Sequence, residues 1–341
     1  MRVHRIIFYS LLIVFTAQIR RASASQKDID WSKIDSREIV LFYPGVSSWE
    51  FLNSEDHRLG GREIRKAGKE CRKCHLGRTG ELDMKADEIA AGTLKMKRSQ
   101  RPFEPSPVPA KKGTMRLAIK SAYDGEFFYI MASWESKGRG FGKGPAPDIA
   151  SDRISFQINR DEAYFKKYGC FIACHDDLNA MPETPSKKAV STNPYFSALG
   201  RDDVRLYAFY AKDAWDKPRQ ADISKKKATG GLIDLVSVEI EGRAFKAQDG
   251  WVLEDRRWEE GGDAGVSATG GFSGGRYTVV LKRSLKAQAG LDQGVEEGQA
   301  IAFAAAVHED NADKRRHYVS FPFTIGFGAD GDIRAKRIDI Q

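Results

Sequence analysis

The chain has 341 residues, of which 30% are charged, and its formal net charge is +8. This length suffices for one large domain or two modest ones. Four of the positive charges are arginines in the first 21 residues, and the other basic residues form no ordered stripe with interleaved aromatics. The charge therefore does not indicate nucleic-acid binding.

The first 24 residues have the pattern of a secretory signal peptide. Arg2 and Arg5 precede an apolar run from Ile6 to Ala17, and Ala22–Ala24 fits an A-x-A cleavage site. The apolar run is shorter than the ~20 residues that span a bilayer. We therefore expect a mature chain that begins at Ser25, is periplasmic and does not itself span a membrane.

The run Cys71-Arg72-Lys73-Cys74-His75 has the C-x-x-C-H pattern of covalent c-type haem attachment. Two thiols at this spacing reach the two vinyl groups on one porphyrin edge, and the adjacent imidazole is placed under the iron. Residues 25–112 are otherwise polar and rich in turns, with one strand-like run at 39–43. We predict a small irregular or helical segment there, in which Cys71 and Cys74 attach a haem and His75 ligates its iron.

The proline-rich stretch Arg101–Pro109 is typical of an extended connection, and we place a domain boundary after it. Beyond residue 113 the hydrophobic period becomes two. Asp124-Gly125 predicts a hairpin between strands at Met115–Ile119 and Phe127–Trp134. Further strand-like runs lie at 154–158, 204–210, 232–240, 277–281, 301–307 and 318–323.

Strand follows strand here without amphipathic helices between them. This pattern predicts a mainly β fold, with an antiparallel β-sandwich in residues 113–341. The glycine-rich stretch Gly261–Gly275 lacks a phosphate-loop lysine and a following helix, so we expect it to be a flexible loop.

The run Cys170-Phe171-Ile172-Ala173-Cys174-His175 is a near copy of the first motif, with one extra residue between the cysteines. A structural disulfide or half of a zinc site are the alternatives. Zinc would need more ligands, and a disulfide gives no reason for a histidine directly after Cys174. We therefore predict a second haem c, attached by Cys170 and Cys174 and ligated by His175.

Four groups of residues carry a resemblance to a known family: Asp124–Glu126 with Trp134, then 152–157, 168–177 and 316–321. Over about residues 113–341 the chain resembles the ethylbenzene-dehydrogenase-related family of cytochrome c-552 and DMSO-reductase-like haem-binding domains. The resemblance implies a β-sandwich that holds one haem near one end. The better-known members are γ subunits of periplasmic molybdenum enzymes, with a Met and a Lys as axial ligands of a non-covalent haem.

This chain departs from that family pattern at both ligand positions. The Cys170–His175 motif stands where the Met would be expected, and His317 lies near where the Lys would fall. The resemblance therefore implies a covalent haem with His175 and His317 as its ligand pair. The segment with Cys71–His75 resembles the haem extension of c-type relatives.

Each iron also needs a sixth ligand. For the first haem we favour His57, fourteen positions before Cys71, because Gly60-Gly61 lets the backbone fold over a haem face. Met84 and Met96 are the alternatives.

For the second haem, the first candidate is His317 and the second is His308, which belongs to an adjacent late strand. Met181, six positions after His175, is a further alternative. A Met ligand would raise the reduction potential relative to two histidines.

The leading hypothesis for function is an exported dihaem c-type cytochrome that relays electrons and has no catalytic residues of its own. The resemblance implies a membrane cytochrome b or a periplasmic molybdenum oxidoreductase as redox partner. The alternative is a haem enzyme, such as a peroxidase or small-oxyanion reductase, with one open iron site. A carbohydrate-binding sandwich would leave the C-x-x-C-H pattern unexplained; its candidate residues are Trp134, Trp215, Trp251 and Trp258.

Overall fold

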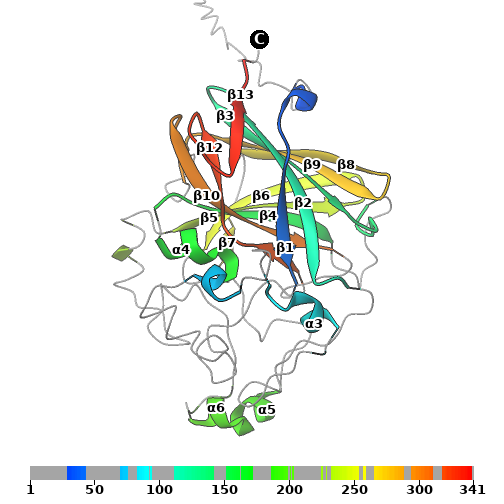
Figure 1. Cartoon of the computed structure of the whole chain (residues 1–341), viewed down its shortest axis with the longest axis vertical. Helices are drawn as coiled ribbons and strands as arrows, with labels where there is room; N and C mark the ends of the chain where they lie inside the picture. Colours follow the sequence, from blue (N-terminus) through cyan, green and yellow to red (C-terminus); the bar gives the residue numbers. More distant parts are fainter. Residues whose placement is uncertain are drawn as a thin grey trace, which may run out of the picture.

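A computed structural model of the chain describes residues 29–43, 70–75, 83–91, 93, 111–141, 151–161, 163–171, 186–198, 200, 202, 224–225, 228, 232–252, 256–258, 265–287, 293–309 and 317–339. These residues form mainly antiparallel β-structure (Figure 1). The predictions for residues 204–210 and for the signal peptide lie outside the described residues.

Thirteen strands are described, and hydrogen bonds between neighbouring strands join all of them into one continuous sheet. The strands are β1 (Arg37–Phe42), β2 (Thr114–Tyr123), β3 (Phe127–Glu135), β4 (Asp152–Asn159), β5 (Ile233–Glu241), β6 (Ala244–Val252), β7 (Arg256–Trp258), β8 (Val266–Ser273), β9 (Arg276–Ser284), β10 (Gln299–His308), β11 (Tyr318–Ser320), β12 (Phe323–Phe327) and β13 (Ile333–Arg337). The short helices are η2 (Trp31–Lys33), η4 (Cys71–Lys73), α3 (Ala86–Ala90), α4 (Ala163–Tyr168), η6 (Gly169–Phe171), α5 (Lys187–Thr192) and α6 (Pro194–Ala198).

This sheet folds over on itself, so that its two halves, here called arms, face each other. One arm has the order β7-β6-β5-β4-β10, and the other has the order β1-β2-β3-β9-β8. Strands β11, β12 and β13 connect β10 to the second arm, and β13 runs parallel to its two neighbours. Inward-facing side chains of both arms form one apolar core, so the predicted β-sandwich is confirmed.

The first hairpin of the sandwich follows the prediction from its sequence. Strands β2 and β3 pair in antiparallel register on either side of Asp124-Gly125. The Asp124 carboxylate accepts hydrogen bonds from the backbone N–H groups of Glu126 and Phe127, each at 2.7 Å. An aspartate that binds the backbone two residues on is the usual cause of such a tight turn.

The expectation of a loop in the glycine-rich stretch is wrong over residues 266–273. These residues form β8, which pairs with β9 along its whole length. At position 270 a side chain would meet the ring of Phe245 in the opposite arm, because a Cβ there would lie 2.6 Å from a ring carbon. The glycine therefore permits close approach of β8 to β6 instead of providing flexibility.

Strand β1 was predicted from its sequence, but it lies in the segment before the expected boundary at residue 113. In the structure it pairs with β2 over its whole length and with β11 at Leu41 and Phe42. This part of the N-terminal segment therefore belongs to the sandwich. The division of the chain at residue 113 stays a prediction for the rest of that segment.

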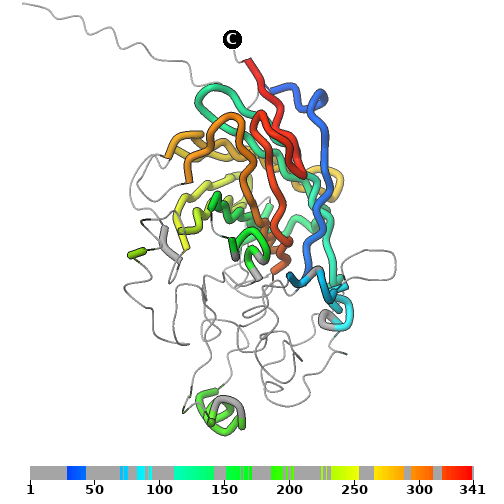
Figure 2. Tube along the Cα trace, turned by 60° about the vertical axis from the view of Figure 1, so that its left-hand side comes forward, coloured from blue at the N-terminus to red at the C-terminus, as the bar shows by residue number. Residues whose placement is uncertain are grey.

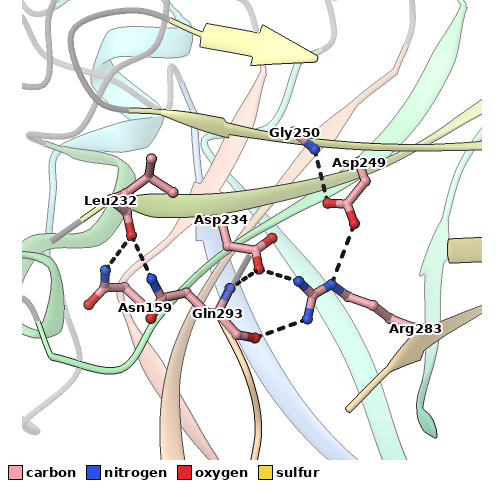
Figure 3. A network of polar contacts seen from close by, with 7 residues as sticks. All are labelled: Asn159, Leu232, Asp234, Asp249, Gly250, Arg283 and Gln293. Carbon is pink, nitrogen blue, oxygen red and sulfur yellow. Dashed lines mark hydrogen bonds and ion pairs between the residues drawn. The ribbon is translucent and has the colours of Figure 1, made fainter. Parts of the chain in front are cut away.

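A buried polar cluster joins the two arms of the sandwich (Figure 3). Arg283 of β9 pairs with Asp234 of β5 and Asp249 of β6, and all three side chains are at most 2% exposed. Gln293 adds its backbone N–H to Asp234 at 2.8 Å and its carbonyl to Arg283 at 3.2 Å. Charges this deeply buried are tolerated only when they are paired and hydrogen-bonded.

Strand β10 is covered on both of its faces. Its inward residues, from Ile301 to Val307, belong to the sandwich core. The alternate residues Ala302, Ala304, Ala306 and His308 face outward, yet each is at most 6% exposed. A second buried layer therefore lies outside the sandwich along β10. Within the described part of the chain, no helix has the length and apolar character to cross a membrane.

Candidate haem-binding sites

The first cysteine motif forms a single helical turn. The backbone N–H groups of Cys74 and His75 both donate to the carbonyl of Cys71, at 3.1 and 2.9 Å, and η4 begins there. The turn places Cys71, Cys74 and His75 together, with Cys74 exposed and the other two half-buried. Two thiols and an imidazole on one turn suit attachment along one edge of a porphyrin.

The imidazole of His75 is oriented by a backbone hydrogen bond. Its Nδ1 lies 2.9 Å from the carbonyl oxygen of Asp83, and the Asp83 N–H donates to the His75 carbonyl at 2.9 Å. A carbonyl only accepts hydrogen bonds, so Nδ1 carries the proton and Nε2 keeps its lone pair. This is the arrangement that metal-ligating histidines use, and the residues present therefore fit a haem iron at Nε2.

Asp83 in turn is fixed by Lys85. The Asp83 carboxylate accepts from the Lys85 backbone N–H at 3.0 Å and lies 2.8 Å from its ammonium. These hydrogen bonds, followed by the charge of Lys85, hold the pKa of the Asp83 carboxyl below its usual range. The Asp83 carbonyl that accepts the hydrogen bond from His75 is thus part of a turn that is itself stabilised by hydrogen bonds.

Helix α3 connects this turn to the sandwich. Asp87 accepts a hydrogen bond from the backbone N–H of Gly113 at 2.9 Å, directly before β2. A Cβ at position 113 would lie 2.2 Å from the Asp87 nitrogen, so the contact requires glycine. The first candidate site is therefore attached to the start of β2.

The second cysteine motif begins against the outer face of β10. Helix α4 ends at Tyr168, and Gly169 follows with a φ of +52°. A Cβ there would lie 3.0 Å from the Cβ of Ala304 and 3.2 Å from Pro322, and Cys170 beside it is buried. Cys174 and His175 lie outside the described residues, as do His57, Met96 and Met181.

Two histidines lie further along the same outer face. His308 ends β10 and His317 directly precedes β11, and each is 4% exposed. Their rings are stacked, with centroids 4.1 Å apart and planes 16° apart. His308 is four positions from Ala304, about 13 Å along the strand. The structure thus brings Cys170, His308 and His317 to one face of the sheet.

The two candidate sites lie at the same end of the sandwich. Figures 1 and 2 show η4, α3 and α4 together at the lower end, away from the C-terminus. Lys111 donates to the carbonyl of Glu309 at 3.3 Å, and its ammonium lies 4.8 Å from the centre of the Tyr318 ring. Tyr318 donates to the Lys112 carbonyl at 2.7 Å. The segment before β2 therefore contacts α3 and also the neighbours of both histidines.

Sequence reasoning missed three residues of these sites. Gly169 carried a usable signal, because a glycine after the last residue of a helix commonly ends it in the left-handed conformation. Asp83 and Lys111 carried none, since both act through contacts made when distant segments come together. Met84 is half-buried directly after Asp83.

Comparison with known proteins gives a consistent family match. Residues 28–237 and 208–320 match the model of the family described as ethylbenzene dehydrogenase. Cytochrome c-552 of Stutzerimonas stutzeri is 28% identical over 313 residues, which cover 90% of each chain. Cytochrome c-551 of Rhodocyclus tenuis is 26% identical over 311 residues, covering 90% of this chain and 99% of the relative.

Similarity to solved structures is weak. A putative carbohydrate-binding protein from Bacteroides uniformis has a TM-score of 0.30 at 8% identity, covering 64% of this chain and 72% of its own. A family 9 carbohydrate-binding module from Caldicellulosiruptor kristjanssonii, in complex with glucose, has a TM-score of 0.26 at 9% identity, covering 62% and 69%. Similarity at this level does not indicate what this chain binds.

Proposed function

Because the chain belongs to the ethylbenzene dehydrogenase family, we propose that it is an exported dihaem c-type cytochrome that relays electrons between redox partners. The observation that carries this proposal is the His75 imidazole, which directly follows Cys74 and whose Nδ1 donates to the Asp83 carbonyl, so that Nε2 is the nitrogen that would ligate an iron. Two relatives that match over 90% of the chain are named cytochromes c, which supports the same proposal.

A bound haem would supply reversible one-electron oxidation and reduction of its iron. Around the first haem, Cys71 and Cys74 form the thioether bonds and His75 is the proximal ligand. The hydrogen bond to Asp83 keeps the imidazole in one tautomer and in one orientation. An imidazole held in this way would bind an iron with little need to move, which would suit electron transfer.

His57 remains our choice for the sixth ligand of the first haem. Met84 directly follows Asp83, so its backbone lies on the Nδ1 side of the His75 ring. A residue that would complete the coordination of an iron held at Nε2 would approach from the side of the ring away from Nδ1. This geometry argues against Met84 and leaves His57 and Met96 as the candidates.

Around the second haem, Cys170 and Cys174 form the thioether bonds and His175 is the proximal ligand. We assign His317 as the sixth ligand, with His308 and Met181 as alternatives. The burial of Cys170 and His317 against β10 and β11 supports this assignment, because a haem is largely apolar and needs a protected face.

Two haems at one end of the sandwich suit a relay. The contacts of Lys111 and Lys112 with Glu309 and Tyr318 hold the first segment against the strands of the second site. We propose a periplasmic location, with a membrane cytochrome b or a periplasmic molybdenum oxidoreductase as the redox partner.

The test uses protein produced in the periplasm together with the haem-attachment machinery. We expect two covalent haems in the wild type and one in each of Cys71→Ala/Cys74→Ala and Cys170→Ala/Cys174→Ala, counted by pyridine haemochrome. The wild type should show reversible reduction without rapid carbon monoxide binding. Rapid binding with a high-spin spectrum would instead indicate an open iron site, as in a haem enzyme, and would overturn the relay.

A further inference from the structure

We propose that His308 is a positioning residue that fixes the ring plane of His317, the sixth ligand of the second haem. The inference rests on the proposed function. It assigns separate roles to two histidines that were alternatives for one ligand position.

The register between β10 and β11 places His308 and His317 opposite each other. Val307 is opposite Tyr318 in the antiparallel register, so His308 and His317 are the next opposite positions. Their side chains leave the same face of the sheet, because side chains of directly opposed residues share a face. The centroid distance of 4.1 Å and the angle of 16° describe two stacked, nearly parallel rings.

This geometry excludes a shared role as the two axial ligands of one iron. The lone pair of an imidazole nitrogen lies in the plane of its ring. Stacked parallel rings therefore direct their lone pairs alongside one another, whereas two axial ligands must direct them toward each other across the metal. One ring of the pair binds iron, and the other packs against its face.

Contact with a stacked ring restricts rotation about the bond between Cβ and the imidazole ring. His308 is well placed for this, since β10 pairs it with Arg153 of β4 on one side and places it opposite His317 on the other. Both histidines are only 4% exposed, so neither side chain points into solvent. The plane of an axial imidazole sets the splitting of the iron d orbitals, and a fixed plane gives one sharp set of low-spin g-values.

The experiment compares holoprotein variants by electron paramagnetic resonance, with the first haem as an internal reference. His308→Ala removes the stacked ring, and we expect two low-spin haems, of which one has shifted and broadened g-values. His308→Phe keeps a flat ring of similar width, and we expect its spectrum to stay close to the wild type. His317→Ala should convert one haem to high spin and allow it to bind carbon monoxide.

Two results would overturn the inference. High-spin iron in both His308 variants with an unaffected His317→Ala would make His308 the ligand. An unchanged spectrum in His308→Ala, even with lower thermal stability, would reduce His308 to a packing residue. If the chain is not a dihaem cytochrome, the wild type itself lacks a second covalent haem. That result differs from both of the outcomes above.

Discussion

At the scale of single residues, the chain shows which site features a local pattern can predict. The spacing of Cys71, Cys74 and His75 requires one helical turn, and the structure forms that turn at η4. The acceptor for the His75 ring is eight positions away, at the backbone of Asp83, where every residue type has the same carbonyl. No sequence pattern marks such a partner, so the turn could be predicted from the sequence and the orientation of the His75 ring could not.

Tyr129 provides a residue-scale test of the sandwich itself. Its side chain is buried and its hydroxyl donates to Asp124 at 2.9 Å. Burial first, and then the Asp124 carboxylate, raise the pKa of Tyr129 well above its usual range. Above about pH 10 the unfolded chain loses this proton while the folded chain keeps it, so alkali destabilises the fold.

We expect Tyr129→Phe to lower the free energy of unfolding by about 0.5–1.5 kcal/mol near neutral pH, because one hydrogen bond is lost. The variant should then lose less stability than the wild type between about pH 8 and pH 11, since it has one ionising group fewer. Urea unfolding followed at both pH values measures the two slopes. Equal alkaline losses would show that Tyr129 ionises as readily in the folded chain as in the unfolded chain.

At the scale of elements, two kinds of strand could be predicted from the sequence. In one kind, apolar and polar residues alternate along the strand, and in the other kind the residues form a continuous apolar run. Strand β3 follows the hairpin signal, and β10 was recognised from its unbroken apolar run. Strand β8 was missed because its residues are small or polar and it lies at an edge of the sheet. It pairs with β9 through the two-residue turn Gly274-Gly275, in which both glycines have positive φ. This is a local hairpin signal that the sequence interpretation did not use.

The contact of η6 with β10 gives an element-scale prediction. Gly169→Ala would place a Cβ 3.0 Å from Ala304 in a backbone with φ of +52°. We expect η6 to shift away from β10 and the second haem to be attached incompletely, with the first unaffected. Haem content assigned to each motif by peptide mapping measures the effect.

Gly200→Ala is the matched control for this change. Its φ is +65°, and a Cβ there has nothing within 4 Å. Both variants carry the backbone cost of about 1–2 kcal/mol for a left-handed residue, but Gly200→Ala should keep two haems per chain. Similar losses of the second haem in both variants would mean that backbone strain, and not the Ala304 contact, is responsible.

At the scale of the whole molecule, the arms of the sandwich are joined at one side by the buried cluster of Arg283. Arg283→Met would leave Asp234 and Asp249 buried without their cation. Removing one partner from a buried ion pair costs about 3–5 kcal/mol, so we expect a large fall in the free energy of unfolding. Thermal or urea unfolding of the holoprotein measures it.

Arg276→Met on the same strand is the control for Arg283→Met. Its pair with Glu135 is at 3.6 Å, with side chains 44% and 78% exposed. Exposed pairs contribute about 0–1 kcal/mol, so this variant should unfold almost as the wild type does. A small effect of Arg283→Met, equal to that of Arg276→Met, would show that the cluster does not hold the arms together.

The placement of the two sites at one end of the molecule depends on contacts that no local pattern predicts. Lys111 and Lys112 meet Glu309 and Tyr318 across about two hundred positions of the chain. The sequence therefore predicted two haem motifs and a sandwich, while their arrangement as neighbours required the fold. The relay proposed above depends on that arrangement.

The proposed relay depends above all on the number of covalent haems in the mature chain. Intact mass of the mature protein, with mapping of haem-bearing peptides, counts the haems and locates them. We expect two haems, one on the peptide with Cys71 and Cys74 and one on the peptide with Cys170 and Cys174. A mature chain with one covalent haem or none would contradict this expectation.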